Sequence, residues 1–379
     1  MQRLCGECAL TGSQACTTAG WRHQLFCGPG HFPGGGGLAK VSTKDKPGEG
    51  TAMTSNMKIV YAPKTMSEAG WALLRARPDV RTVGFENMVK PADFRAALAD
   101  TGAHAAILGV TPFGAPELEA GRTVQVVARI GVGYDAIDVP ALSRLRVPLM
   151  IAGTANSASV AECAMFMMIS LAKRWNDLDK AVKENRWNDR WVFLPQDLLE
   201  KQLLIVGFGR IGTRTAKRAL AMDMKVAVYD PYVPADAIKA AGCMPVADLD
   251  AALAAADFVT LHCPKTPETV GLINASRLAR MKPTAFLVNT ARGGIVDEAA
   301  LYAALTGKKL AGAGLDVFDK EPPEPENPLF KLPNVLCAPH MAGVTREAMD
   351  RMAMAAVKNV LSVFDGAPIA ENVVNKDVL

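Results

Sequence analysis

The sequence predicts an α/β protein whose sheets are parallel, and three features of the chain support this. From Met57 onward, short runs of valine, isoleucine and leucine alternate with alanine-rich segments of helical pattern. Many of these runs are continuously apolar, which is typical of strands buried on both faces of a parallel sheet. The chain has 379 residues, half of them hydrophobic, so it can form two domains with sizeable cores.

The expected strands form two series, separated by a long apolar segment. The first series comprises residues 58–62, 104–110, 123–130 and 148–153, and the second comprises 203–209, 225–230, 257–263, 285–290, 310–318 and 334–340. The segment between them, residues 156–175, is predicted to be a helix that begins at an S-x-x-E capping box formed by Ser159 and Glu162. Its methionine-rich stripe is interpreted as packing, against this chain or a second copy, rather than as a cofactor site.

The first 56 residues differ from the rest of the chain. Residues 28–37 and 42–50 consist mainly of glycine, proline and charged residues. Such segments bury too little apolar surface to offset the entropy of ordering, so a disordered extension is predicted. Met53 or Met57 is accordingly a candidate for the actual translation start, with the residues before it resulting from an upstream start assignment.

The eight cysteines fall into two groups. Cys5 and Cys8 have the C-x-x-C spacing of some zinc sites. The spacing from them to Cys16 and Cys27 matches no common zinc finger, so no metal site is predicted. The other four are predicted to be small core-filling residues in a reducing compartment. They are Cys163, Cys243, Cys263 and Cys337.

Charge and hydropathy argue against several partners. The formal net charge is only +4, and the lysines and arginines are dispersed, whereas nucleic-acid-binding domains carry clustered cations. No apolar run reaches the length of a membrane-spanning helix, and no signal-peptide core is visible. These features predict a cytoplasmic protein that binds neither nucleic acid nor membrane.

A nucleotide-binding pattern begins the second strand series. Gly207, Gly209 and Gly212 have G-x-G-x-x-G spacing between an expected strand and a helix, and Asp230 ends the next strand. Glycines let the backbone approach a pyrophosphate, whose charge is stabilised at the helix N-terminus. Asp230 would accept hydrogen bonds from the adenosine ribose and repel a 2′-phosphate, so NAD is predicted rather than NADP.

Three polar residues lie at or just beyond the ends of later strands of the same series. Arg292 and Glu321 each lie just beyond an expected strand, and His340 is the last residue of one. The carboxyl ends of parallel strands meet at one edge of an open sheet, beside the ligand crevice. A guanidinium, a carboxylate and an imidazole at this edge would suit proton transfer to an oxygen of an anionic substrate.

Several ordered motifs resemble those of the D-2-hydroxyacid dehydrogenases: "GVGYDAID", "GFGRIG", "HCPKTPET", "NTARGGIVDEAAL", "AGAGLDVFDKEP" and "APHMAGVT". The resemblance runs from about Val124 to the end. It implies a doubly wound Rossmann-type NAD-binding domain, residues 154–340, inserted in a flavodoxin-like substrate domain formed by residues 57–153 and 341–379. It also implies a homodimer, with the helix that contains "VAE" at the interface.

The resemblance assigns roles to individual residues. Arg292 would bind the carboxylate and keto oxygens of a 2-oxo acid, and Val132 and Gly133 would offer backbone N–H groups to the carboxylate. His340 would be the acid–base residue and Glu321 its partner. The positions implied to contact NAD are Gly207, Gly209, Arg210, Ile211, Gly212, Asp230, Cys263, Thr290, Ala291, Asp316 and His340, with Asp316 on the nicotinamide carboxamide.

The substrate is less well specified than the chemistry. A glyoxylate- or hydroxypyruvate-type 2-oxo acid is favoured, because residues 108–114 lack the arginine that phosphoglycerate-specific members often carry there. The end at Leu379 leaves no room for the regulatory domain of some of those members. D-3-phosphoglycerate oxidation stays the alternative within this class, and an NADH-sensing corepressor-like protein the alternative outside it. Glu321, in place of glutamine, argues against the formate-oxidising branch, and Lys265 has no explanation from the sequence.

Overall fold

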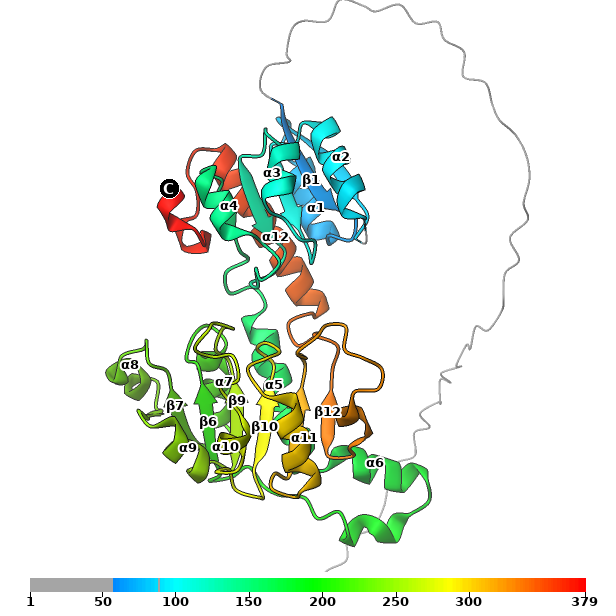
Figure 1. The fold of residues 1–379 in the computed structure, drawn as a ribbon, viewed down its shortest axis with the longest axis vertical. Coiled ribbons are helices and arrows are strands. Elements are labelled where there is room, and N and C mark those ends of the chain that lie inside the picture. The colour runs from blue at the N-terminus through cyan, green and yellow to red at the C-terminus, as the bar shows by residue number, and fades with distance from the viewer. Residues whose placement is uncertain (1–56, 88) are drawn as a thin grey trace, which may run out of the picture. The chain divides into compact units, whose positions relative to one another are not determined.

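Two parallel sheets organise the chain (Figure 1). The computed structural model describes residues 57–87 and 89–379. One sheet is built from residues 58–150 and the other from residues 202–337. The predicted α/β class with parallel sheets is therefore confirmed, whereas the predictions made for residues 1–56, the disordered extension and its cysteines, lie outside the described residues.

The first sheet has five strands in the order β2-β1-β3-β4-β5. All four pairings are parallel, and this order is that of flavodoxin-like folds. The strands are β1 (Lys58–Pro63), β2 (Val80–Phe85), β3 (Ala105–Leu108), β4 (Val126–Arg129) and β5 (Leu149–Met150). The flanking helices are α1 (Glu68–Arg75), α2 (Pro91–Thr101), α3 (Ala115–Ala120) and α4 (Val139–Arg144).

A helix from the end of the chain completes the core of this sheet. In α12 (Arg346–Phe364), Ala353, Ala356, Val357 and Val360 are fully buried against residues of β1, β3 and β4. The 3-10 turns η3 (Ala370–Asn372) and η4 (Lys376–Val378) follow it. The chain thus leaves the first sheet after β5 and returns to it only after the second sheet is complete.

The second sheet has seven parallel strands in the order β12-β11-β10-β9-β6-β7-β8. The order reverses between β6 and β9, and such a switch point is where open α/β sheets bind ligands. The strands are β6 (Gln202–Val206), β7 (Lys225–Tyr229), β8 (Met244–Pro245), β9 (Phe258–Leu261), β10 (Phe286–Asn289), β11 (Gly312–Leu315) and β12 (Val335–Cys337).

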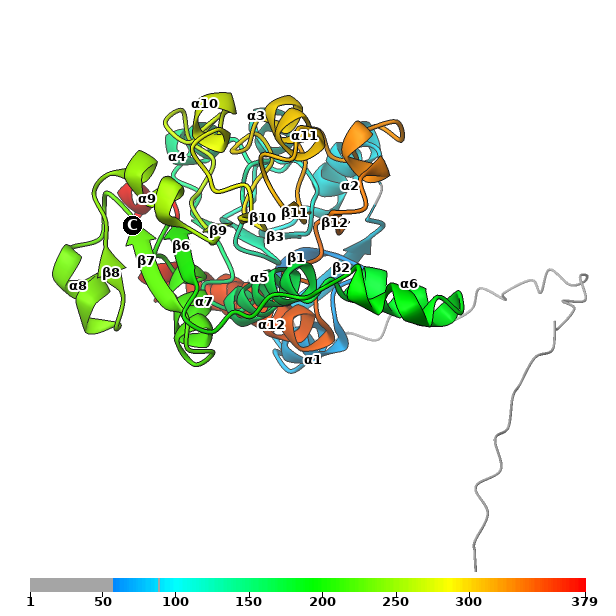
Figure 2. The same ribbon diagram turned by 90° about the horizontal axis from the view of Figure 1, so that it is seen from below.

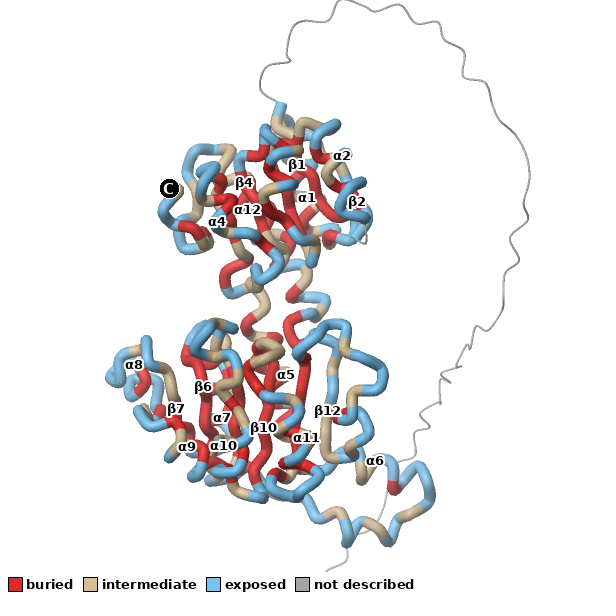
Figure 3. The backbone as a smooth tube through the Cα atoms, viewed as in Figure 1, coloured by how far each residue is buried: buried red, intermediate tan, exposed pale blue. Residues whose placement is uncertain are grey.

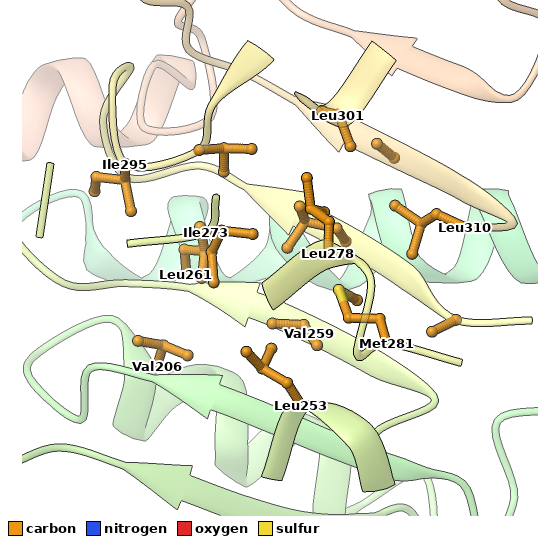
Figure 4. Close-up of a cluster of buried hydrophobic side chains, with 14 of the residues drawn as sticks. Val206, Leu253, Val259, Leu261, Ile273, Leu278, Met281, Ile295, Leu301 and Leu310 are labelled. Atoms are coloured by element: carbon orange, nitrogen blue, oxygen red, sulfur yellow. The ribbon is translucent and has the colours of Figure 1, made fainter. Parts of the chain in front are cut away.

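Apolar side chains cover both faces of this sheet, as continuous apolar strands predict. Leu204 and Val206 face one cluster, and Leu203 and Ile205 face the other. Helices α9 (Leu249–Ala255), α10 (Ala275–Leu278) and α11 (Glu298–Thr306) cover the first cluster, which Figure 4 shows in detail. Helices α5 (Ser157–Ala172) and α7 (Gly212–Leu220) lie on the opposite side (Figure 2), and α8 (Ala235–Ala240) follows β7.

The start of α5 differs from the prediction. The helix begins at Ser157 after Asn156, so Ser159 and Glu162 lie inside it and the predicted capping box is wrong. The Ser159 hydroxyl lies 3.3 Å from the Thr345 hydroxyl, and Glu162 forms an ion pair with Arg218. Both side chains thus interact with residues that are distant in sequence.

The methionines of α5 are packing residues, as predicted. Met165, Met167 and Met168 are buried in the core of the second sheet. Met167 lies against Gly314 of β11, where an added methyl group would come within 3.0 Å of its side chain. Burial is concentrated in the strands of both sheets (Figure 3). Among the described residues, no helix combines the length and apolar character needed to cross a membrane.

Candidate active site

The glycines of the nucleotide loop have separate structural tasks. Gly207 has a φ of 95°, and a Cβ atom there would lie 2.6 Å from the backbone nitrogen of Cys263. A Cβ on Gly212 would lie 2.1 Å from the carbonyl oxygen of Gly207, so this glycine lets α7 pack on the loop. A Cβ on Gly209 would meet no described atom within 4 Å. Gly209 is therefore where the backbone is open to a ligand.

Asp230 follows β7 and holds the glycine-rich loop. Its Oδ2 accepts a hydrogen bond from the backbone N–H of Phe208 at 2.7 Å, and its Oδ1 accepts one from Tyr232 at 2.9 Å. A carboxylate oxygen can accept more than one hydrogen bond, so these bonds leave capacity for a ribose. The loop-holding role was missed from the sequence, because the motif predicted only the ligand contact.

Other predicted cofactor positions surround this loop. Arg210 donates to the carbonyl oxygen of Gly153 at 3.1 Å, and Ile211 directly precedes α7. Burial raises the pKa of the Cys263 thiol to about 11, so this thiol is neutral at physiological pH. Burial likewise lowers the pKa of His262 to about 3, which keeps that imidazole neutral.

Two buried polar atoms near the strand ends have no partner among the described residues. They are the hydroxyl oxygen of Thr290 and the Nδ1 of His262. Buried polar groups are normally hydrogen-bonded, and an exception indicates a missing partner such as a ligand or water. Together with the open backbone at Gly209, these atoms fit a polar ligand such as NAD.

His340 and Glu321 form a direct pair. The Nδ1 of His340 lies 2.7 Å from Oε2 of Glu321, and the other oxygen of Glu321 accepts from the backbone N–H of Phe318 at 3.0 Å. His340 has a φ of 56°, in the left-handed region that few non-glycine residues adopt. Its side chain is 48% exposed, so the ring is held at one nitrogen and open to solvent elsewhere.

Asp316 fixes the segment that carries His340. Its side chain is fully buried and accepts hydrogen bonds from the backbone N–H groups of Met341 at 2.8 Å and Ala342 at 2.9 Å. The backbone N–H of His340 donates to the Asp316 carbonyl at 2.8 Å. Burial raises the pKa of the Asp316 carboxyl, and the two N–H donors oppose that shift. Its predicted contact with the nicotinamide carboxamide stays a prediction.

Arg292 follows β10 on a turn shaped by Asn289. The amide of Asn289 donates to the Arg292 carbonyl at 2.9 Å and accepts from the Ala291 N–H at 3.0 Å. The guanidinium donates to Oδ2 of Asp135 and to the Ala291 carbonyl, at 2.9 and 2.7 Å. A Cβ on Gly133 would lie 2.2 Å from Nη2 of Arg292, so the structure brings these two predicted substrate-binding residues together. Val132 precedes Gly133 and is half-buried.

Arg129, the last residue of β4, is a site residue that was not predicted from the sequence. Its Nε donates to the Gly133 carbonyl at 3.0 Å, and its Nη1 is buried without a partner among the described residues. Burial lowers its pKa to about 10; Asp135 opposes this shift and Arg292 adds to it. Arg129 is therefore a second cation beside Arg292. An arginine at the end of an apolar strand was the available signal, the same one that singled out Arg292.

Comparison with known proteins identifies the family. The family model for the NAD-binding domain of D-isomer specific 2-hydroxyacid dehydrogenases matches residues 165–342. A glyoxylate reductase of Korarchaeum cryptofilum is 39% identical over 271 residues, which cover 71% of this chain and 81% of that protein. The chain belongs to the D-isomer specific 2-hydroxyacid dehydrogenase family. Its cofactor is accordingly NAD.

A further relative and a solved structure extend this comparison. A D-3-phosphoglycerate dehydrogenase of Archaeoglobus fulgidus is 40% identical over 265 residues, which cover 70% of this chain and 50% of that protein. The chain thus spans about half the length of the phosphoglycerate dehydrogenases that it matches. The crystal structure of TT0316 protein from Thermus thermophilus superposes with a TM-score of 0.75 at 32% identity, covering 83% of this chain and 99% of that one.

The glycine geometry of this family member gives a testable contrast. We expect Gly212→Ala to destabilise the fold by about 1–3 kcal/mol, because its methyl group would overlap the Gly207 carbonyl. Gly209→Ala should leave the melting temperature unchanged but weaken NADH binding about tenfold, because its methyl group would stand where a pyrophosphate approaches. Thermal unfolding and NADH fluorescence titration measure the two effects. Equal effects of both substitutions on both properties would contradict this division of tasks.

Proposed function

We propose that this chain catalyses the reversible, NAD-dependent interconversion of a small 2-oxo acid and a D-2-hydroxy acid, with a glyoxylate- or hydroxypyruvate-type substrate. The observation that carries the proposal is the 2.7 Å contact between His340 and Glu321 on loops that adjoin the Arg292 turn. Bound NADH supplies a hydride to the substrate carbon. In this assignment residues 57–153 and 341–379 form the substrate domain, and residues 154–340 form the NAD-binding domain.

The proposed chemistry divides between binding and proton transfer. The Arg292 guanidinium binds the substrate carboxylate, since a planar fork of N–H donors matches two oxygens. Backbone N–H groups at Val132 and Gly133 complete the carboxylate site. His340 donates a proton to the keto oxygen during reduction and removes it from the hydroxyl in the reverse direction. Glu321 holds Nδ1 and so orients the ring.

A specific observation also supports the second candidate substrate, D-3-phosphoglycerate. The expectation against it rested on the lack of a further cation, and Arg129 is such a cation next to Arg292 and Gly133. A phosphate needs cations and N–H donors to replace its hydration. The glyoxylate-type substrate stays our first proposal, because the chain matches the Korarchaeum glyoxylate reductase over 81% of its length.

The test is NADH oxidation with a panel of acids. We would measure kcat/KM for glyoxylate, hydroxypyruvate, pyruvate and phosphohydroxypyruvate, with NADPH as a cofactor control. The proposal predicts the highest kcat/KM among the unphosphorylated acids. Preference for phosphohydroxypyruvate would support the second candidate, and no oxidation with any 2-oxo acid would refute the enzymatic proposal.

We also propose that two copies associate through α5, the helix that contains Val160–Glu162, together with the segment between α5 and β6. This segment holds α6 (Trp175–Lys183) and η1 (Trp187–Trp191). Seven of its large apolar side chains are between 58% and 70% exposed: Trp175, Val182, Trp187, Trp191, Val192, Leu194 and Leu199. Such a concentration of exposed apolar residues is typical of an interaction surface. We further propose a cytoplasmic location, with which the four free cysteine thiols of the described residues agree.

Removing two of these side chains tests the dimer. We expect sedimentation to give twice the chain mass for the native protein. Trp187→Asp combined with Trp191→Asp should weaken association at least about 100-fold, because buried tryptophans are often dominant contacts. Met244→Asp, at a residue that is 53% exposed on β8, is the matched control. A native monomer, or an undisturbed double variant, would refute the interface.

A further inference from the structure

The loop that carries Arg292 is packed directly against the loop that carries Glu321. A Cβ on Gly293 would lie 1.7 Å from the carbonyl oxygen of Phe318, so the two backbones touch at a position that only glycine can occupy. Phe318 in turn donates its N–H to Glu321, which holds His340. The turn that carries Arg292 is therefore linked to the Glu321–His340 pair through the contact between Gly293 and Phe318.

Asp319 bonds the two loops together at this contact. Its Oδ1 accepts the backbone N–H of Gly294 at 2.7 Å. Its own backbone N–H donates at 2.6 Å to Glu298, the first residue of α11, and Glu298 also accepts from Asn327 at 2.9 Å. Asp319 thus lies two residues before Glu321, and it binds the backbone N–H of Gly294, which lies two residues after Arg292.

Lys265 gains an explanation from the same cluster. Its Nζ lies 2.9 Å from the position of a Cβ on Gly294, and its positive charge favours the ionised form of Asp319. The backbone of Gly294 is also held from the other side, where its carbonyl accepts the N–H of Gly271 at 2.7 Å. A lysine at this position therefore places a cation beside the carboxylate that joins the loops.

The electrostatics do not explain Asp319 as a stabilising residue. Burial raises the pKa of its carboxyl, the charge of Glu298 raises it further, and the Gly294 N–H and Lys265 oppose the shift. A carboxyl whose pKa is higher in the folded state contributes stability only at low pH, and this contribution is lost as the pH rises through the folded-state pKa. The observed role of the Asp319 side chain is instead its hydrogen bond to the Gly294 N–H.

We propose that Asp319 is a positioning residue that couples the Arg292 turn to the Glu321–His340 pair, by holding the N–H of Gly294. The inference rests on the proposed function, because it assigns carboxylate binding to Arg292 and proton transfer to His340. Displacement of the turn would misplace the guanidinium relative to the imidazole. A substrate must contact both groups at once, so the loss would fall on substrate binding and turnover rather than on NADH binding.

Two substitutions separate the hydrogen bond from the charge. Asp319→Ala removes the acceptor, and we expect KM for the best 2-oxo acid to rise about tenfold or more, with the NADH dissociation constant unchanged. Asp319→Asn keeps an amide oxygen that can accept a hydrogen bond from the Gly294 N–H, so its KM should stay close to that of the native protein. Lys320→Ala is the matched control, because Lys320 is the next residue and its side chain pairs with Glu324 instead.

Amide hydrogen exchange provides a readout that does not depend on turnover. Faster exchange of the Gly294 amide in Asp319→Ala, but not in Asp319→Asn or Lys320→Ala, is the expected result. Unchanged exchange and unchanged KM in Asp319→Ala would overturn the inference, as would a parallel loss of NADH binding. Failure of the proposed function is distinguishable, because the native protein would then reduce no 2-oxo acid, while the exchange measurement would still report on the Gly294 contact.

Discussion

Replacement of His340 by asparagine is expected to lower kcat for 2-oxo acid reduction by about 10²–10⁴-fold, the usual contribution of a positioned general acid. Asparagine is the better probe than alanine, because it tolerates the left-handed conformation that His340 adopts at a φ of 56°. The substitution removes the imidazole but preserves the backbone, which Asp316 anchors through the N–H groups of residues 341 and 342. The NADH dissociation constant should therefore stay nearly constant.

The partner of His340 provides the companion measurement. Glu321→Gln keeps an oxygen for the Phe318 N–H and a similar shape, but removes the charge beside Nδ1. We expect a smaller loss of kcat than in His340→Asn. Steady-state kinetics and fluorescence titration with NADH distinguish the effects. If His340→Asn weakened NADH binding as much as turnover, the main role of His340 would be cofactor contact rather than proton transfer.

Replacement of Arg292 by lysine should have a comparably large effect, on substrate binding. An arginine fork makes two charge-assisted hydrogen bonds to a carboxylate, each worth roughly 1.5–3 kcal/mol, whereas an ammonium cannot reproduce the pair. Lysine also cannot keep the simultaneous contacts to Asp135 and the Ala291 carbonyl. We expect kcat/KM for the 2-oxo acid to fall by about 10²–10⁴-fold, with NADH binding retained.

The control for Arg292 is an arginine away from the site. Arg280 is 56% exposed and lies near Asp250, and Arg280→Lys should leave kcat/KM within about twofold, as is usual for surface ion pairs. KM for the acid and kcat are measured separately, because loss of a carboxylate contact appears in KM when it is made equally in the ground and transition states. An unchanged kcat/KM in the Arg292→Lys variant would show that Arg292 does not bind the substrate.

The sequence was sufficient for the elements and residues that have local signals. Continuous apolar runs predicted ten of the twelve strands that the described residues form, and glycine spacing predicted the loop after β6. Strands β2 and β8 were not predicted, because neither has a continuous apolar run. The position of Arg292, Glu321 and His340 at or beyond the ends of strands marked them as site candidates, since parallel strands end at one edge of the sheet. Of these, the structure pairs Glu321 with His340 directly and places Arg292 on an adjoining loop.

The features that sequence analysis missed depend on contacts between distant segments. Arg129 is recognisable as a second cation only when β4 lies near Arg292, which is 163 positions away in the chain. The role of Asp319 depends on a bond to Gly294, in another loop. The capping box at Ser159 was wrong for the same reason, because that hydroxyl lies beside Thr345 and the helix begins two residues earlier. Local spacing contains no information on such tertiary partners.

In the proposed mechanism, one guanidinium and one imidazole contact the same small acid beside the cofactor. The most direct measurement is a crystal structure of the complex with NADH and oxamate, an unreactive 2-oxo acid analogue. We predict that the Arg292 guanidinium contacts the oxamate carboxylate and that Nε2 of His340 lies within hydrogen-bond distance of the oxygen that corresponds to the keto group. Oxamate bound elsewhere, or His340 turned away from it, would contradict the account.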